Sequence, residues 1–262
     1  MRLVVVGDIH VQPDKLWRML REAGLADERN KPTEELREGD VKLVLLGDLV
    51  HAKSRERYAN LINVRRYDEY NPRHLERAEQ AQERFLREVK GFQDRVPEGR
   101  MVILMGNHDF NAVTEDQGPL RTDDVAHLEW KPGHGNPMDA ELKDWILGWP
   151  YELVIEGLHL AHVGPLPEHN SFDQGFYLEN RRRWIQEDAD YLEGTDYRLG
   201  IYGHTPVRGG VNVASQGRAL LLDTNGHKDE YVYLDADVTE AGYRLRLKGL
   251  FFDELIPREE PA

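Results

Sequence analysis

Five short motifs in this chain combine glycine with side chains that can bind a metal ion. They are Gly7-Asp-Ile-His10, Gly47-Asp48, Gly106-Asn-His-Asp109, His162-Val-Gly164 and Gly203-His204-Thr205. Carboxylate, amide oxygen and neutral imidazole are ligands that suit manganese, iron or zinc. The chain has 0 cysteines, which excludes thiolate metal sites, disulfides and a cysteine nucleophile. The motifs together predict a catalytic metal centre built from oxygen and nitrogen ligands.

The first three motifs each follow a short apolar run that is rich in β-branched residues. The runs 2–7, 41–47 and 101–106 all end at glycine, as buried strands of a parallel sheet do. Helical patterns at 13–23 and 74–95 separate them. This β-α-β-α-β order predicts parallel strands whose carboxyl ends, and therefore whose motifs, lie at one edge of a sheet.

The second half of the chain changes to shorter, more varied patterns. Residues 153–162 predict a hairpin turned at Glu156-Gly157, and residues 178–192 predict a helix. Further strands are expected at 197–202, 218–223, 230–234 and 243–250. The stretches 51–73 and 110–150 fit no regular pattern, and both follow metal motifs, a position in which long loops are often binding loops.

Length and composition indicate a single globular domain and argue against membrane and nucleic-acid-binding proteins. The chain has 262 residues, 40% of them hydrophobic, with no linker or repeat, so we expect one α/β domain over 1–255 and a flexible tail at 256–262. Its apolar runs are far shorter than the roughly 20 residues that span a bilayer. We therefore expect a cytoplasmic protein with no membrane partner. The net charge of −14 opposes general nucleic-acid binding, because it lacks a basic footprint for phosphates.

The five motifs, in this order, resemble those of the calcineurin-like metallophosphoesterases. That family carries GDxH, GDxx, GNH[DE], a later histidine and a final GH, and the matching segments here extend from Gly7 to His204. The resemblance implies an α/β fold, a four-layer sandwich of two mixed β-sheets flanked by helices.

The resemblance also implies a binuclear metal centre. The first metal would be held by Asp8, His10 and Asp48, and Asp48 would bridge to the second. The second would be completed by Asn107, His162 and His204. Both ions would be divalent, with manganese preferred and iron, zinc or nickel as alternatives. In this family the metal pair holds a bridging hydroxide that attacks phosphorus, and His108 would protonate the leaving oxygen.

Departures from the family pattern bear on the substrate. Pro206 stands where many phosphodiesterases and nucleases have the second histidine of GHxH, and residues 221–226 are similar to the LDTG-like strand end of phosphoprotein phosphatases and symmetrical diadenosine tetraphosphatases. Those two branches carry GDxVDRG, in which aspartate orients the acid histidine and arginine grips phosphate. Here residues 47–53 read GDLVHAK instead, and GDxxH is reminiscent of the double-strand-break repair nucleases.

These departures leave several roles open. His51 is a candidate for catalysis and for direct substrate contact, or a loop histidine with a surface hydrogen bond. The missing arginine needs a substitute, because a guanidinium fork commonly orients a phosphoryl group. The candidates are Arg55, Arg57, Arg181, Arg182, Arg183 and Arg208. Arg208 is preferred because it lies just past His204.

Other polar residues have structural explanations. Strand alternation places His159 on the face opposite to His162. Asp109 would make a supporting hydrogen bond or cap a turn. Trp149 would pack in the core or form a wall for a flat base. His127, His134 and His169 are expected to be exposed in loops.

The sequence therefore favours a two-metal phosphoesterase for phosphomonoesters or phosphoanhydrides, of the phosphoprotein or dinucleoside polyphosphate type. A phosphorylated small molecule or protein would be its substrate. The alternatives are a phosphodiesterase or nuclease of the same superfamily, and a scaffold that has lost its metals. The sequence gives no indication of the oligomeric state.

Overall fold

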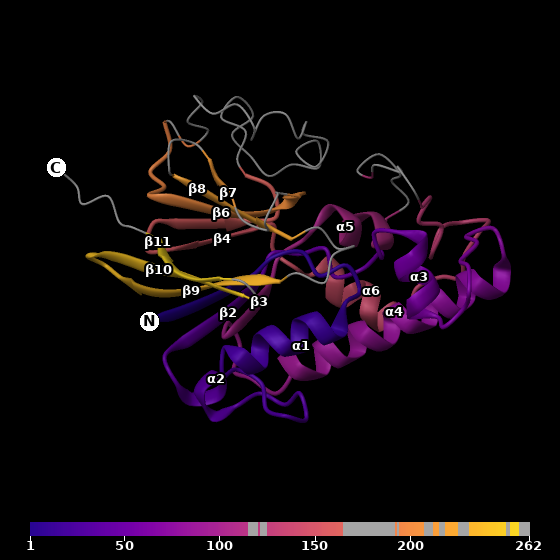
Figure 1. Cartoon of the computed structure of the whole chain (residues 1–262), viewed down its shortest axis with the longest axis horizontal. Helices are drawn as coiled ribbons and strands as arrows, with labels where there is room; N and C mark the ends of the chain where they lie inside the picture. The colour runs from indigo at the N-terminus through magenta and orange to yellow at the C-terminus, as the bar shows by residue number, and fades with distance from the viewer. Residues whose placement is uncertain are drawn as a thin grey trace.

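Two β-sheets carry the five motifs (Figure 1). The computed structural model describes residues 1–114, 120, 125–164, 192, 194–206, 212–214, 218–224, 231–249 and 252–256, with only the backbone of 206, 212–214 and 252–256. Within these residues the two sheets are stacked face to face, and helices cover the outer face of the first (Figure 1).

The first sheet contains the three motif-bearing strands of the N-terminal half. Its members are β1 (Arg2–Val6), β2 (Val41–Leu45), β3 (Met101–Ile103), β9 (Val232–Thr239), β10 (Gly242–Gly249) and β11 (Phe252–Ile256). The strand order is β11-β10-β9-β1-β2-β3. β1, β2 and β3 are parallel, which confirms the prediction, and the other pairs are antiparallel.

The second sheet holds the remaining two motifs. Its members are β4 (Glu152–Ile155), β5 (Leu158–Ala161), β6 (Leu199–Pro206), β7 (Asn212–Ala214) and β8 (Ala219–Asp223), in the order β4-β5-β6-β8-β7. β4 and β5 form the predicted hairpin, and β5, β6 and β8 are parallel. Both sheets are therefore mixed, as the resemblance implies.

Strand alternation divides the apolar residues between two cores. On β1, Leu3 and Val5 pack between the sheets against residues such as Leu160 and Leu234. The intervening residues Val4 and Val6 face the helices instead. A strand with apolar residues on both faces is what a continuous β-branched run requires.

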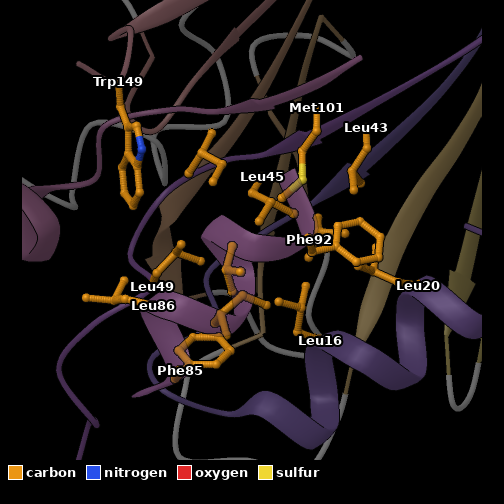
Figure 2. Close-up of a cluster of buried hydrophobic side chains, with 14 of the residues drawn as sticks. Leu16, Leu20, Leu43, Leu45, Leu49, Phe85, Leu86, Phe92, Met101 and Trp149 are labelled. Atoms are coloured by element: carbon orange, nitrogen blue, oxygen red, sulfur yellow. The ribbon is translucent and has the colours of Figure 1, made fainter. Parts of the chain in front are cut away.

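Two long helices cover the outer face of the first sheet (Figure 1). They are α1 (Pro13–Glu22) and α4 (Pro72–Gln93), close to the predicted ranges. Trp17 of α1 and Phe92 of α4 pack with ring centroids 5.4 Å apart. Figure 2 shows Leu16 and Leu20 of α1, together with Phe92, beneath the strand residues Leu43 and Met101. This core fixes the strands whose ends carry the site.

Several elements were not predicted from the sequence. The stretches that fit no regular pattern contain α3 (Arg55–Leu61) and α6 (Ala140–Leu147). Two further short helices, α2 (Glu34–Glu38) and α5 (Asn107–Val113), were also missed. Strands β7 and β11 were also missed. Such short elements carry little periodic signal and are stabilised by their neighbours. The predicted helix at 178–192 lies outside the described residues apart from Leu192, so the described part of the molecule shows three of the four expected layers.

None of the helices in the described part of the chain combines the length and the apolar character needed to cross a membrane.

Candidate metal centre

The five motifs meet at the carboxyl ends of strands from both sheets. The first three follow β1, β2 and β3, the fourth follows β5, and His204 lies within β6. The pairing of β6 with β8 shifts register between Tyr202 and Pro206, and His204 has φ +61°. This bulge turns the histidine towards the other motifs, although the sequence predicted that the strand ends before it. Bulges commonly re-aim a side chain beside an active site.

Asp8, His10 and Asp48 form the first group of candidate ligands. The Nε2 atom of His10 lies 3.6 Å from Asp8 Oδ2 and 3.5 Å from Asp48 Oδ2. The Nδ1 atom of His10 faces the backbone oxygens of Val50 and His51, at 3.3 and 3.1 Å. A ring held through Nδ1 in this way directs Nε2 at the carboxylates, which is the usual arrangement of a metal-binding histidine.

Asn107, His162 and His204 form the second group. Asn107 Oδ1 lies 2.9 Å from His162 Nε2 and 2.9 Å from His204 Nδ1. His162 Nε2 is also 3.4 Å from Asp48 Oδ2, so Asp48 lies between the two groups. The Nδ1 atom of His162 is held by the backbone oxygen of Leu46 at 2.8 Å. The six side chains therefore form two adjoining clusters that share Asp48.

Several buried polar atoms of the candidate ligands have no hydrogen-bond partner, which indicates whether the site suits a metal ion. Asp8 Oδ2, His10 Nε2 and Asp48 Oδ2 are buried and make no hydrogen bond. Leaving such an atom unpaired costs roughly 1–3 kcal/mol, and more when it is charged. Three of them facing one another, with oxygen and imidazole donors, fit a divalent transition-metal ion.

The charges in this cluster are strongly coupled. Burial opposes ionisation of Asp48, but His162 and His108 hold the pKa of Asp48 well below its ordinary value. Burial also opposes a charge on His162, yet Asp48 and Asp8 raise its pKa to about 9. Burial and the charge on His162 lower the pKa of His204 to about 4. Without an ion, a proton on His162 therefore offsets part of the negative charge of the two carboxylates.

The backbone is strained where it presents these side chains. His10, Asp48 and His204 all have φ between +47° and +61°, a region that residues other than glycine seldom occupy. The motif glycines allow the loops to touch. A Cβ on Gly203 would collide with Asp8 Oδ1, and a Cβ on Gly106 would collide with the amide and carboxylate of Asp48. Substitution at either glycine would therefore separate the ligands.

Asp109 joins the second and third motif loops. Its Oδ2 atom accepts hydrogen bonds from the amides of Asp48 (2.6 Å) and Gly106 (3.3 Å), and its Oδ1 atom accepts from the amides of Leu49 (2.9 Å) and Val50 (3.2 Å). Burial and Asp48 raise the pKa of Asp109 to about 7, while the amide donors favour its ionised form. Asp109 is thus the brace that holds Asp48 in position.

His108 lies beside the first ligand group, with Nε2 4.0 Å from Asp48 Oδ2. The fully buried His51 approaches it, with 3.2 Å between their Nδ1 atoms. The Nζ atom of Lys53 lies 3.0 Å from His108 Nε2. Burial first, and then the charge of Lys53, lowers the pKa of His108 well below its ordinary value.

Sequence reasoning missed Lys53, although it stands two positions after His51 in the second motif loop. The preferred arginine, Arg208, lies outside the described residues, as do Arg181 to Arg183. Arg55 pairs with Glu69 at 2.8 Å. Among the basic side chains that the structure describes, Lys53 is the one that contacts His108.

The remaining histidines divide between buried and exposed positions. His127 was expected to be exposed but is buried, with its ring stacked on His51 at 4.5 Å between centroids. That expectation was wrong because Tyr58 of α3, His51 and His108 surround the ring. His134 is exposed as expected, and His169 lies outside the described residues.

Two further expectations concern strand and core positions. His159 hydrogen bonds with Tyr202 (2.7 Å) and Glu152 (3.1 Å), on the face of β5 away from the ligands, as alternation predicted. Trp149 packs in the core beneath the first sheet (Figure 2). Both residues have structural roles.

The brace formed by Asp109 leads to a prediction about stability. We expect Asp109→Ala to lower the free energy of unfolding by about 3–5 kcal/mol, because it leaves several buried amides unpaired. Asp27→Ala is a matched control, since Asp27 Oδ1 also accepts from two amides, those of Arg29 and Lys31, but on the surface. Urea unfolding of both variants measures the difference. Equal losses would contradict the role of Asp109 as a brace.

Comparison with known proteins agrees with this geometry. Residues 1–236 match the family model for calcineurin-like phosphoesterases. A symmetrical bis(5'-nucleosyl)-tetraphosphatase from Methylobacillus flagellatus is 27% identical over 128 residues, which cover 48% of this chain and 43% of that protein. The match therefore spans less than half of the relative's length.

Solved structures show the same fold at low sequence identity. A cold-active protein-tyrosine phosphatase from a psychrophilic Shewanella species has a TM-score of 0.56 and 16% identity, covering 94% of this chain and 77% of that one. A protein serine/threonine phosphatase from Saccharomyces cerevisiae has a TM-score of 0.51 and 12% identity, covering 99% and 82%. With the family model matching most of its length, the chain belongs to the calcineurin-like phosphoesterase family.

Proposed function

We propose that this protein is a two-metal phosphatase that hydrolyses phosphomonoesters or phosphoanhydrides. The observation that carries the proposal is the set of buried, unpartnered atoms on Asp8, His10 and Asp48, which adjoins the cluster of Asn107 and His162. This arrangement is costly without ions and suits two of them.

The six candidate ligands would hold the two ions, with Asp48 shared. Manganese is our preferred metal, because carboxylate and carbonyl oxygens suit it and imidazole is compatible with it. A metal pair of this kind supplies an activated nucleophile and neutralises charge on the phosphoryl oxygens. Loading would release a proton from His162, because a ligating imidazole must be neutral.

His108 would act on the leaving group. In the resting site its depressed pKa keeps it neutral at pH 7. A phosphate dianion beside the ring favours the charged imidazolium and so raises the pKa of His108. Once Lys53 leaves Nε2 for a phosphoryl oxygen, His108 would hold a proton at Nε2, the atom that faces the centre, and donate it to the leaving oxygen.

His51 and Lys53 together would replace the Asp-Arg pair of the related phosphatases. His51 is fully buried and contacts the ring of His108, so we assign it to positioning that ring rather than to direct substrate contact. Lys53 is half-buried, and its Nζ atom lies 3.0 Å from His108 Nε2, which supports a position of its ammonium group at the site. Lys53 would bind a phosphoryl oxygen as a point charge.

The proposed substrate class depends on the known relatives and on Pro206, which replaces the second histidine of the GHxH motif. The relative named as a symmetrical bis(5'-nucleosyl)-tetraphosphatase supports a dinucleoside polyphosphate, and the protein phosphatases of the same fold support a phosphoprotein. The second candidate function is a phosphodiesterase, favoured by His51 in the GDxxH motif. The contact of His51 with His108 gives that residue a role in either reaction.

We expect p-nitrophenyl phosphate to be hydrolysed faster than bis-p-nitrophenyl phosphate when manganese is supplied. The leaving group is the same, so the comparison isolates the ester class. Asn107→Ala serves as the blank, because it removes the oxygen between His162 and His204. A clear preference for the diester would favour the phosphodiesterase. Lack of bound manganese, with activity equal to the blank on both esters, would favour a scaffold.

Replacing the candidate acid should slow turnover without removing the metals. We expect His108→Ala to lower kcat by about 100-fold to 10,000-fold, the usual contribution of a general acid. Its manganese content, measured by mass spectrometry of the metal, should match that of the parent protein. His134→Ala, on an exposed loop, is the control and should retain full activity. Full activity in His108→Ala would rule out the assignment.

Replacing the candidate phosphate ligand should weaken substrate use. We expect Lys53→Gln to lower kcat/KM by about 10-fold to 100-fold, because a hydrogen bond to a charged group contributes about 1.5–3 kcal/mol. Lys53→Arg should recover part of the loss, whereas Lys143→Gln, on an exposed helix position, should change little. Unchanged kcat/KM in Lys53→Gln would show that another cation binds the phosphate.

A further inference from the structure

Three side chains that can bind a metal lie together behind His108, apart from the six candidate ligands. They are His51, His127 and Glu129, with exposed fractions of 0%, 4% and 0%. One ligand atom of each lies within 4.8 Å of the other two. Two imidazoles and one carboxylate, drawn from the second motif loop and from the 125–131 segment, are thus buried in one place.

Each of these side chains is held through one polar atom. His51 Nδ1 lies 3.2 Å from His108 Nδ1, and His127 Nδ1 lies 3.0 Å from the hydroxyl of Tyr58. Glu129 Oε1 accepts a hydrogen bond from Gln82 Nε2 at 3.2 Å. Metal-binding histidines and carboxylates are usually oriented in this way by a partner on the other atom.

In two of these side chains the other polar atom lacks a partner. His51 Nε2 and Glu129 Oε2 are buried and make no hydrogen bond. Native interiors seldom leave such atoms unpaired, and an unplaced ion or water is one usual reason. The two orphaned atoms belong to the same cluster, so a single occupant would satisfy both.

We propose that His51, His127 and Glu129 bind a third divalent transition-metal ion, and that Zn²⁺ is the ion that suits these ligands best. Two histidines and a glutamate are the ligands of several zinc sites, which leave a fourth position for water. Bonds of about 2.0–2.2 Å would bring the three ligand atoms closer together than the 4.8 Å within which they lie. The ion would join the second motif loop to the 125–131 segment and fix the ring of His51 that contacts His108.

The surrounding charges are compatible with this site. Burial first, and then Lys53, lowers the pKa of His127 to about 3, so that its imidazole is neutral as a ligand must be. Burial raises the pKa of Glu129 to about 7, with a smaller contribution from the negative charge of Glu79 and against the hydrogen bond of Tyr58. Lys131 supplies an opposing positive charge but is directed to the backbone oxygens of Asn111 (2.5 Å) and Thr114 (3.3 Å).

Crystals grown with Zn²⁺ test the proposal directly by anomalous scattering at the zinc edge. We expect a peak bonded to His51, His127 and Glu129, separate from those of the proposed pair. Because Asn107→Ala disrupts only the pair, the third peak should persist in that variant, so failure of the pair and failure of this site are distinguishable. Density without anomalous signal between the three side chains would identify a water and overturn the proposal.

Zinc content after dialysis tests the same site in solution. We expect about three ions per chain in the parent protein and about two in Glu129→Gln and His127→Gln, because each variant removes a ligand. Glu83→Gln and His134→Gln are matched controls and should retain about three, since Glu83 contacts Trp130 Nε1 (3.3 Å) without joining the cluster. Unchanged zinc content in Glu129→Gln would also overturn the proposal. If that variant does not fold, the anomalous map of the parent protein decides.

Discussion

The buried carboxylates of Asp8 and Asp48 impose the constraint on which the rest of the site depends. Two such charges in a protein interior are stable only with positive charge and hydrogen-bond donors close by. The backbone supplies donors, because the amide of His204 donates to Asp8 Oδ1 at 3.1 Å and that of His108 donates to Asp48 Oδ1 at 2.9 Å. His162 supplies the charge when no ion is bound. The second oxygen of each carboxylate makes no hydrogen bond, and a metal pair would satisfy both.

The fold meets this constraint by bringing loops from two sheets together. Parallel strands place the first three loops at one edge, and the inter-sheet core aligns β5 and β6 with them. Asp109 then ties the second loop to the third, and Gly106 and Gly203 let the backbones approach. The cost of left-handed φ at His10, Asp48 and His204 is offset by this packing. The strands therefore fix where the loops lie, and the strained loop backbone orients the candidate ligands.

The surroundings of His108 distinguish this chain from the phosphatases that it resembles. His51 stands at the aspartate position of the GDxVDRG motif, Ala52 stands at the arginine position and Lys53 follows. The ring of His108 is therefore approached by an imidazole and an ammonium group. Both the burial and the ammonium charge disfavour a resting imidazolium. Negative charge from a bound phosphate would favour the imidazolium form of His108.

The sequence by itself determined the three parallel strands, the hairpin, the helices α1 and α4 and the family to which the chain belongs. These features depend on local periodicity and on glycine motifs, and both can be recognised in the amino-acid sequence alone. Tertiary structure alone brought Lys53 to His108, buried His127 against Tyr58 and His51, and buried Glu129 against Gln82 of α4, because those positions follow from how irregular segments pack. It also set the bulge that turns His204, since a register shift between β6 and β8 has no signal in either strand alone. Contacts between residues far apart in sequence are fixed by packing, which no local pattern encodes.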